Sequence, residues 1–354
     1  MATIMRKFIF KTTTFSIPFF ILYSIVIFGY KIDEGDLLRL GYIFDISNYR
    51  KIFKKEITDD NIYYSRISEI NLNKKQTYKY VVFGDSFSEK IPSNGYSYTN
   101  YLAKDNNVLL CDRFLSRNPI QSLVSFINGN IFDELNIEYL ILESVERSFV
   151  ARGKINFQKT TNIETLTELI KKQKNKSIDK PSSKIFFLPS TVESFISLNI
   201  QYLFYDNPNS SPVYKVNTTK ELFSDKNNTL LFYKDDINAI ELNNKYSKVL
   251  ELDITLNKIS ELLRKKGIKL IVIPCADKYD TYWEYINNKT IYKEPLFFNI
   301  MDTLPKTYIY LNSKRVLKKI ITKEKDLYFY DDTHWSPKGM KIIANKIINM
   351  TKSQ

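Results

Sequence analysis

The chain is poor in histidine, cysteine and glycine. Among 354 residues there is one histidine, His334, with two cysteines and nine glycines. Protein zinc sites usually take several histidine or cysteine ligands, and no carboxylate cluster stands at ligand spacing, so we predict no metal site. Cys111 and Cys275 are too few for a disulfide framework. Each follows an apolar run, so we expect two buried thiols rather than a bridge.

Acidic residues are outnumbered by basic ones, 39 to 52, for a formal net charge of +13. Such a surplus favours an anionic partner. No zinc-finger spacing or RNA-binding signature is present and the lysines are spread out, so we predict no nucleic-acid partner and favour a membrane surface or an acidic glycan. The alternative is that a Lys-, Asn- and Ile-rich composition reflects an AT-rich genome and carries no message about partners.

Charge is also absent from a stretch near the N-terminus. Residues 1–11 carry Arg6, Lys7 and Lys11, and residues 12–30 contain no charged side chain. At about 1.5 Å per helical residue this stretch matches the bilayer core. The preceding basic residues predict a cytoplasmic N-terminus, a single-pass anchor in the cytoplasmic membrane and an extracytoplasmic (periplasmic) body. A cleaved signal peptide is the alternative, but no A-x-A-like site follows.

The rest of the chain predicts an α/β fold. Residues 31–75 are interpreted as a membrane-proximal linker or cap, and 76–354 as the catalytic domain. Apolar, β-branched runs predict strands, and a helical pattern between them ends at Gly267; a last helix is expected to begin with Ser336 as its N-cap and Pro337 at its first position. This alternation indicates a three-layer, mostly parallel sheet, with residues 150–247 inserted between the third and fourth strands. The strands are expected within 78–88, 106–114, 137–149, 268–274 and 326–330.

A serine and the lone histidine are the candidate reactive groups. Ser86 follows the first predicted strand in "VVFGDSFS", and His334 follows the last in "YFYDDTHWSPKG". Parallel sheets place functional groups at the carboxyl ends of their strands, so the two should meet at one edge. A serine hydroxyl needs a base, and the base needs an orienting carboxylate. Asp331 and Asp332 both remain candidates for that carboxylate.

The combination of "FGDSFS" (83–88) with "YDDTHWSPKG" (330–339) resembles the SGNH hydrolase superfamily. More narrowly, it is similar to the AlgJ/AlgX-type polysaccharide (alginate) O-acetyltransferases. Three further stretches support the likeness, and the N-terminal anchor is similar to the arrangement in AlgJ. The resemblance covers roughly residues 76–350 and implies an SGNH hydrolase-like sheet of flavodoxin-like topology. The supporting stretches are 141–149, 230–237 and 261–286.

The resemblance implies roles for particular residues. Ser86 would be the nucleophile, His334 its base and Asp332 the orienting acid, whereas a D-x-x-H arrangement would select Asp331. No G-x-N-D motif follows the third strand, so the Ser86 backbone N–H needs a second oxyanion donor from elsewhere. Candidates for that donor or for substrate contacts are Arg113, Arg117, Asn118, Arg147, Lys278 and Trp335. Arg147 is also interpreted as a structural ion pair with Glu146, and Trp335 as a core residue.

The expected function is therefore transfer of acetyl, through Ser86, to hydroxyls of a cell-surface or secreted polysaccharide. The resemblance implies no bound cofactor, and an acetyl donor supplied by a membrane acyltransferase of the MBOAT type or by a small acyl ester. A carbohydrate O-acetylesterase of the same fold is the first alternative. A non-catalytic glycan-binding or assembly protein is the second.

Overall fold

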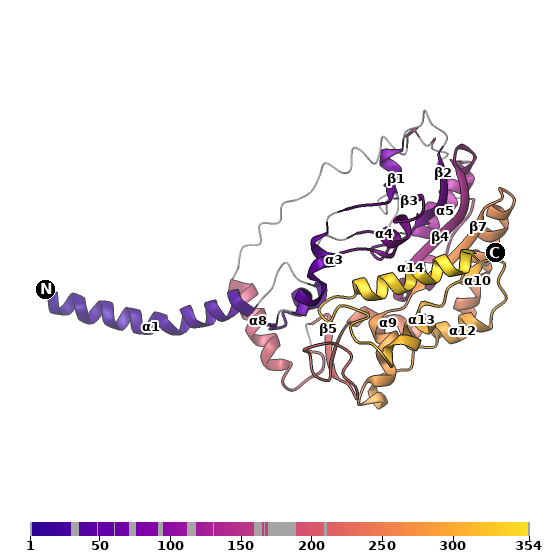
Figure 1. Ribbon diagram of the computed structural model, residues 1–354. Helices are drawn as coiled ribbons and strands as arrows, with labels where there is room; N and C mark the ends of the chain where they lie inside the picture. Colours follow the sequence, from indigo (N-terminus) through magenta and orange to yellow (C-terminus); the bar gives the residue numbers. More distant parts are fainter. Residues whose placement is uncertain are drawn as a thin grey trace.

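The computed structural model (Figure 1) shows an α/β domain, in which helices cover both faces of a central sheet, and one long helix that extends from this domain. It describes residues 2–29, 35–47, 49–59, 61–70, 76–90, 95–111, 118–129, 131–158, 165, 167–168, 189–208 and 211–352. The long helix is α1 (Ala2–Gly29), and its Thr3–Val26 stretch is apolar enough to span a membrane; a signal sequence would meet the same criterion. The helix thus begins nearer the N-terminus than the uncharged stretch alone indicated.

The main sheet has six parallel strands in the order β1-β3-β2-β4-β7-β8. Without the short edge strand β1, this is the flavodoxin-like order expected from the resemblance. Four strands occur where the apolar runs predicted them, and β1 and β8 are additional. The bounds are β1 Ser65–Arg66, β2 Thr77–Phe83, β3 Val108–Cys111, β4 Asn136–Val145, β7 Lys269–Cys275 and β8 Ile309–Tyr310.

Helices cover both faces of this sheet, as a three-layer fold requires. Alternate residues of each strand enter opposite cores: Val82 packs with one set of helices and Val81 with the other. The first set is α4 (Tyr98–Ala103), α13 (Ser313–Ile321) and α14 (Pro337–Lys352). The second set is α5 (Pro119–Asn128), α6 (Glu146–Arg152), α10 (Tyr246–Arg264) and α12 (Phe297–Thr303).

Two helix boundaries agree with the sequence signals. Gly267 has φ +77°, which favours glycine, and ends the helical segment before β7. Ser336 caps α14: its Oγ accepts from the Gly339 N–H at 3.4 Å, and Pro337 occupies the first helical position.

The remaining elements lie around the ends of the strands. Residues 150–247 contain a separate two-stranded hairpin and, in Figure 1, a helix beside the end of α1. These elements are α8 (Pro189–Gln201), β5 (Val213–Asn217), β6 (Thr229–Tyr233) and α9 (Lys234–Asn243). The others are α2 (Asp36–Gly41), α3 (Lys54–Thr58), α11 (Lys278–Tyr282) and the 3₁₀ turns η1 (Tyr49–Phe53), η2 (Ile67–Glu69), η3 (Ile131–Glu134), η4 (Trp283–Tyr285) and η5 (Lys289–Ile291).

The strand predicted at 326–330 is wrong. Only Tyr328 makes a β-bridge, to Trp335, and the edge beside β7 is taken by β8 instead. Residues 327–329 are fully buried, which explains the apolar run. Their carbonyls accept from scattered donors rather than from a neighbouring strand: the Ser336 N–H donates to Leu327 O, the Tyr49 hydroxyl to Tyr328 O and the Lys278 ammonium to Phe329 O. The segment is a buried loop that leads into Asp331 and His334.

Candidate active site

Ser86 lies in the turn directly after β2. At Gly84, a Cβ atom would overlap Ser88 Oγ and Glu143 Oε2, so only glycine lets the turn pack this closely. The Asp85 carboxylate fixes the turn to the end of β4, because it accepts from the Phe87 N–H at 3.3 Å and the Val145 N–H at 2.9 Å. Ser86 therefore lies at the carboxyl edge of the sheet, on a turn that has no room for a side chain at Gly84.

Two ionisable groups beneath this turn have opposite pKa shifts. Burial would raise the pKa of Asp85, but the Arg152 guanidinium, whose Nη1 lies 2.7 Å from Oδ2, and the hydrogen bond from the Val145 N–H together lower it below its ordinary value. Burial, followed by the charge of Asp85, raises the pKa of Glu143 well above its ordinary value. Glu143 Oε2 accepts from the Asp85 N–H at 2.9 Å and from Ser88 Oγ at 2.6 Å. Burial therefore favours the neutral form of Glu143, which holds the turn through these two hydrogen bonds.

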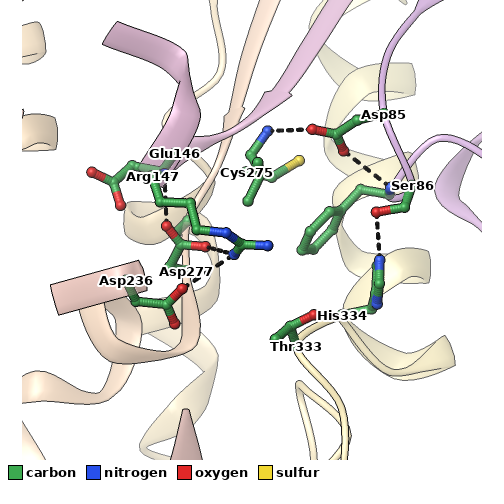
Figure 2. Close-up of polar contacts among 12 residues, drawn as sticks. Asp85, Ser86, Glu146, Arg147, Asp236, Cys275, Asp277, Thr333 and His334 are labelled. Carbon is green, nitrogen blue, oxygen red and sulfur yellow. Dashed lines mark hydrogen bonds and ion pairs between the residues drawn. The ribbon is translucent and has the colours of Figure 1, made fainter. Parts of the chain in front are cut away.

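Ser86, His334 and Asp332 form one hydrogen-bonded chain (Figure 2 shows its Ser86–His334 part). His334 Nε2 lies 2.6 Å from Ser86 Oγ, and His334 Nδ1 lies 2.5 Å from Asp332 Oδ1. The His334 backbone N–H also donates to Asp332 Oδ1, at 2.9 Å. The Phe87 ring packs 4.8 Å from the imidazole, centroid to centroid. The arrangement lets Nε2 accept the serine proton while Nδ1–H donates to the carboxylate.

Burial and charge have opposite effects on this pair. Burial raises the pKa of Asp332, but His334 and then Arg50 outweigh it, so the pKa lies far below its usual range. Burial lowers the pKa of His334, but the Asp332 carboxylate outweighs it and the pKa lies above 6.5. The other aspartate, Asp331, points away from the imidazole: Arg50 Nε lies 2.6 Å from its Oδ2 and Arg50 Nη2 lies 3.0 Å from its Oδ1.

Two residues of the site were not found from the sequence. Arg50 comes from η1, and Asp36 from α2 accepts from the Thr333 N–H at 2.9 Å and Thr333 Oγ1 at 2.7 Å. Both lie in the segment interpreted as a linker or cap, nearly 300 positions from their partners, and no local motif marks them. The segment therefore contributes to the site as well as to the sheet edge.

The other predicted residues are mostly structural. Arg113 and Arg117 lie outside the described residues. The Asn118 side chain caps α5, accepting from the Ile120 N–H at 3.0 Å. Trp335 is fully buried against Phe87, which favours the core interpretation over a sugar-lining one.

Lys278 does not contact solvent as a glycan-binding residue would. It is 1% exposed, and its ammonium donates to Phe329 O at 2.9 Å and Tyr330 O at 2.8 Å. Burial lowers its pKa to about 7, against the opposing charge of Asp331. The strand-end position suggested access to a glycan, but the loop before Asp331 covers Lys278, so its place in the structure favours a structural role.

Arg147 forms ion pairs, but not with Glu146. Its Nη1 lies 2.5 Å from Asp277 Oδ1 and 3.2 Å from Asp236 Oδ1, whereas Glu146 accepts from the Asn243 side chain. Burial would lower the pKa of Arg147, but Asp277 and Asp236 raise it, so the side chain keeps its charge. In Figure 2 the outer end of the guanidinium points toward the side of the site that holds Ser86 and His334.

Asp36, Asp332 and His334 each place one metal-ligating atom within 4.8 Å of the others. Asp36 accepts from the Thr333 N–H, Asp332 Oδ1 accepts from His334 Nδ1, and Arg50 Nη2 lies 3.4 Å from Asp332 Oδ2. These carboxylate oxygens therefore already have hydrogen-bond donors and a positive charge beside them. The set therefore suits proton transfer better than a cation.

Residues 230–354 match the family model described as the SGNH hydrolase-like domain of the acetyltransferase AlgX. The match includes Asp332 and His334, and Ser86 lies upstream of it. No curated protein matches the chain with significant similarity. Together with the parallel sheet, the match supports an acetyltransferase or esterase type of function on polysaccharide. Over residues 230–354 the chain is thus similar to the SGNH hydrolase-like domain of the acetyltransferase AlgX.

Proposed function

We propose that the protein is an extracytoplasmic O-acetyltransferase that carries acetyl on Ser86 and passes it to a hydroxyl of a cell-surface or secreted polysaccharide. The observation that carries this proposal is the hydrogen-bonded chain from Ser86 through His334 to Asp332. The similarity to AlgX supports the choice of acetyl and polysaccharide.

In the first half-reaction, Ser86 Oγ attacks the carbonyl carbon of an acetyl ester while its proton moves to His334 Nε2. Collapse of the tetrahedral intermediate breaks the bond to the donor alcohol, and the imidazolium returns the proton to the leaving oxygen. Asp332, ionised because its pKa is low, holds the Nδ1–H and stabilises the imidazolium.

In the second half-reaction, a sugar hydroxyl gives its proton to His334 Nε2 and attacks the acetyl carbon. The bond to Ser86 breaks, and Ser86 Oγ recovers the proton. The Ser86 N–H has no partner among the described residues, so it is free to donate to the oxyanion. A second oxyanion donor from Arg113, Arg117 or Asn118 stays a proposal.

Arg147 is our candidate for contact with the substrate. Asp236 and Asp277 fix one of its nitrogens, which orients the rest of the guanidinium toward the site at little entropic cost. A fixed, charged fork suits the ester oxygen or an acidic sugar. The basic surplus of the chain favours an acidic glycan in the same way.

The apolar α1 helix supports anchoring of this activity at the outer face of the cytoplasmic membrane. There a membrane acyltransferase of the MBOAT type would supply the acetyl group, and no bound cofactor is needed. A small acyl ester can replace the donor in vitro.

The test is transfer from 4-nitrophenyl acetate to an oligosaccharide, followed by mass spectrometry. We expect acetylated sugar with wild-type protein and none with Ser86→Ala. Acetate release without acetylated sugar would select the esterase alternative. Normal surface acetylation in cells carrying Ser86→Ala would select the non-catalytic alternative.

A further inference from the structure

The loop that carries Asp332 and His334 is held by the segment that directly follows α1. The Leu37 N–H donates to Asp331 O at 3.0 Å, and a Cβ on Gly35 would overlap that carbonyl. The Tyr49 hydroxyl donates to Asp326 Oδ1 at 3.0 Å. Residues 35–47 and 49–53 therefore contact the loop before the imidazole near both of its ends, at Asp326 and Asp331.

Two charged side chains of this segment reach the reacting pair itself. Arg50 binds both oxygens of Asp331, reaches Asp332 Oδ2 at 3.4 Å and stacks over the Phe329 ring at 4.5 Å. The Arg50 and Asp331 side chains are 10% and 2% exposed, so solvent screens this contact weakly. Asp36 holds Thr333 through two hydrogen bonds, and its own N–H reaches Asp332 Oδ2 at 3.3 Å.

We infer that Arg50 and Asp36 are positioning residues that fix the Asp332–His334 pair for its reaction with Ser86. Asp332 Oδ1 faces His334, and Oδ2 faces Arg50 and the Asp36 N–H, so the segment selects one rotation of the carboxylate. Asp36 fixes the residue between the acid and the base, which sets their separation. The inference rests on the proposed function for its kinetic test, but its structural test does not.

His334 supplies the structural test because it is the single histidine of the chain. In ¹³C-histidine-labelled full-length protein without a histidine tag, one imidazole signal reports its pKa. The charged groups around it are Asp332 on its own loop, Asp36 on α2 and Asp85 on the turn after β2, with Arg50 behind Asp332. Burial and then the charge of Asp332 raise the pKa of Asp36 itself, and the ionised Asp36 in turn raises the pKa of His334. Asp36→Asn should therefore lower the pKa of His334, and an unchanged pKa would overturn the inference for Asp36.

The kinetic test uses acetylation of Ser86 by 4-nitrophenyl acetate in Arg50→Met, Arg50→Lys and Lys51→Met. Lys51 is the matched control, because it is an exposed cation on the same 3₁₀ turn. Arg50→Met should lower kcat about tenfold to a hundredfold with KM little changed, since misplaced catalytic groups cost rate rather than binding. Arg50→Lys should restore only part of the loss, because lysine keeps the positive charge but its ammonium cannot bind both aspartates in a fixed geometry.

Full activity of folded Arg50→Met, or an equal loss in Lys51→Met, would overturn the inference for Arg50. If Arg50→Met does not fold, Arg50→Lys and the isosteric Asp36→Asn decide, since both keep the packing. A wild-type protein that shows no acetylation would refute the proposed function, while the His334 titration would still decide whether the segment positions the imidazole.

Discussion

Replacing Asp332 with asparagine should reduce acetyl transfer far more than the same change at Asp331. All four groups around the Asp332 carboxylate are donors: His334 Nδ1 at 2.5 Å, the His334 N–H at 2.9 Å, the Asp36 N–H at 3.3 Å and Arg50 Nη2 at 3.4 Å. An asparagine amide has one oxygen for them, and its NH₂ must face the others.

Both orientations of that amide are unfavourable. With the oxygen toward His334, the NH₂ faces the Asp36 N–H and the Arg50 guanidinium. With the NH₂ toward His334, Nδ1 must accept, so the proton moves to Nε2 and Nε2 can no longer accept from Ser86. We expect a loss of about 10³- to 10⁴-fold in kcat, or about 4–5.5 kcal/mol of transition-state stabilisation.

At Asp331, asparagine still offers Arg50 an acceptor and leaves the imidazole untouched, so we expect a loss below about tenfold. The assay is the pre-steady-state burst of 4-nitrophenol at pH 8, with thermal unfolding to show that both variants are folded. A severe loss in Asp331→Asn beside a mild one in Asp332→Asn would refute the reasoning and establish the D-x-x-H arrangement.

Substitutions at three further positions, Glu143, Lys278 and Gly84, are tested by denaturant unfolding. The raised pKa of Glu143 favours its protonated form, so Glu143→Gln should leave the stability almost unchanged near pH 5 and make the protein more stable than wild type as pH rises. Glu143→Ala should instead lose about 1–3 kcal/mol, because it leaves buried donors unpaired. Equal losses in the two variants would contradict an uncharged Glu143. The free energy of unfolding of wild type should rise relative to that of Lys278→Met between pH 7 and about 10.5. In this range the unfolded chain keeps the Lys278 proton, whereas the folded protein, in which the pKa is about 7, has released it. A difference between the two proteins that does not change with pH would show a fully charged ammonium. Gly84→Ala should cost about 1–3 kcal/mol of stability and most of the activity, since its methyl group overlaps Ser88 Oγ and Glu143 Oε2. If Gly84→Ala is as stable as wild type, the turn can accommodate the methyl group and the argument for glycine is refuted.

The sequence located the parts of the site that depend on local pattern. β2 leads into the Ser86 turn because an apolar run meets a glycine, and Ser336 and Pro337 begin α14 directly after His334. The parallel order of the sheet then brings these distant segments to one edge.

The rest depended on contacts that no local pattern encodes. Residues 326–330 have a strand-like composition but are buried, and donors from Ser336, Tyr49 and Lys278 satisfy their carbonyls. Lys278 is covered by the same loop, which a strand-end position cannot indicate. Arg50 meets Asp331 across 281 positions, so its place in the site follows only from the packing of η1 against the loop before His334.

Acetylation of Ser86 is the central step of the proposed function. The most direct measurement is mass spectrometry of peptides from protein quenched during reaction with 4-nitrophenyl acetate. We predict one acetyl group on Ser86, lost on addition of an oligosaccharide acceptor and absent in Ser86→Ala. An unmodified Ser86 in protein that still transfers acetyl, or an equal acetyl signal elsewhere in Ser86→Ala, would contradict the account.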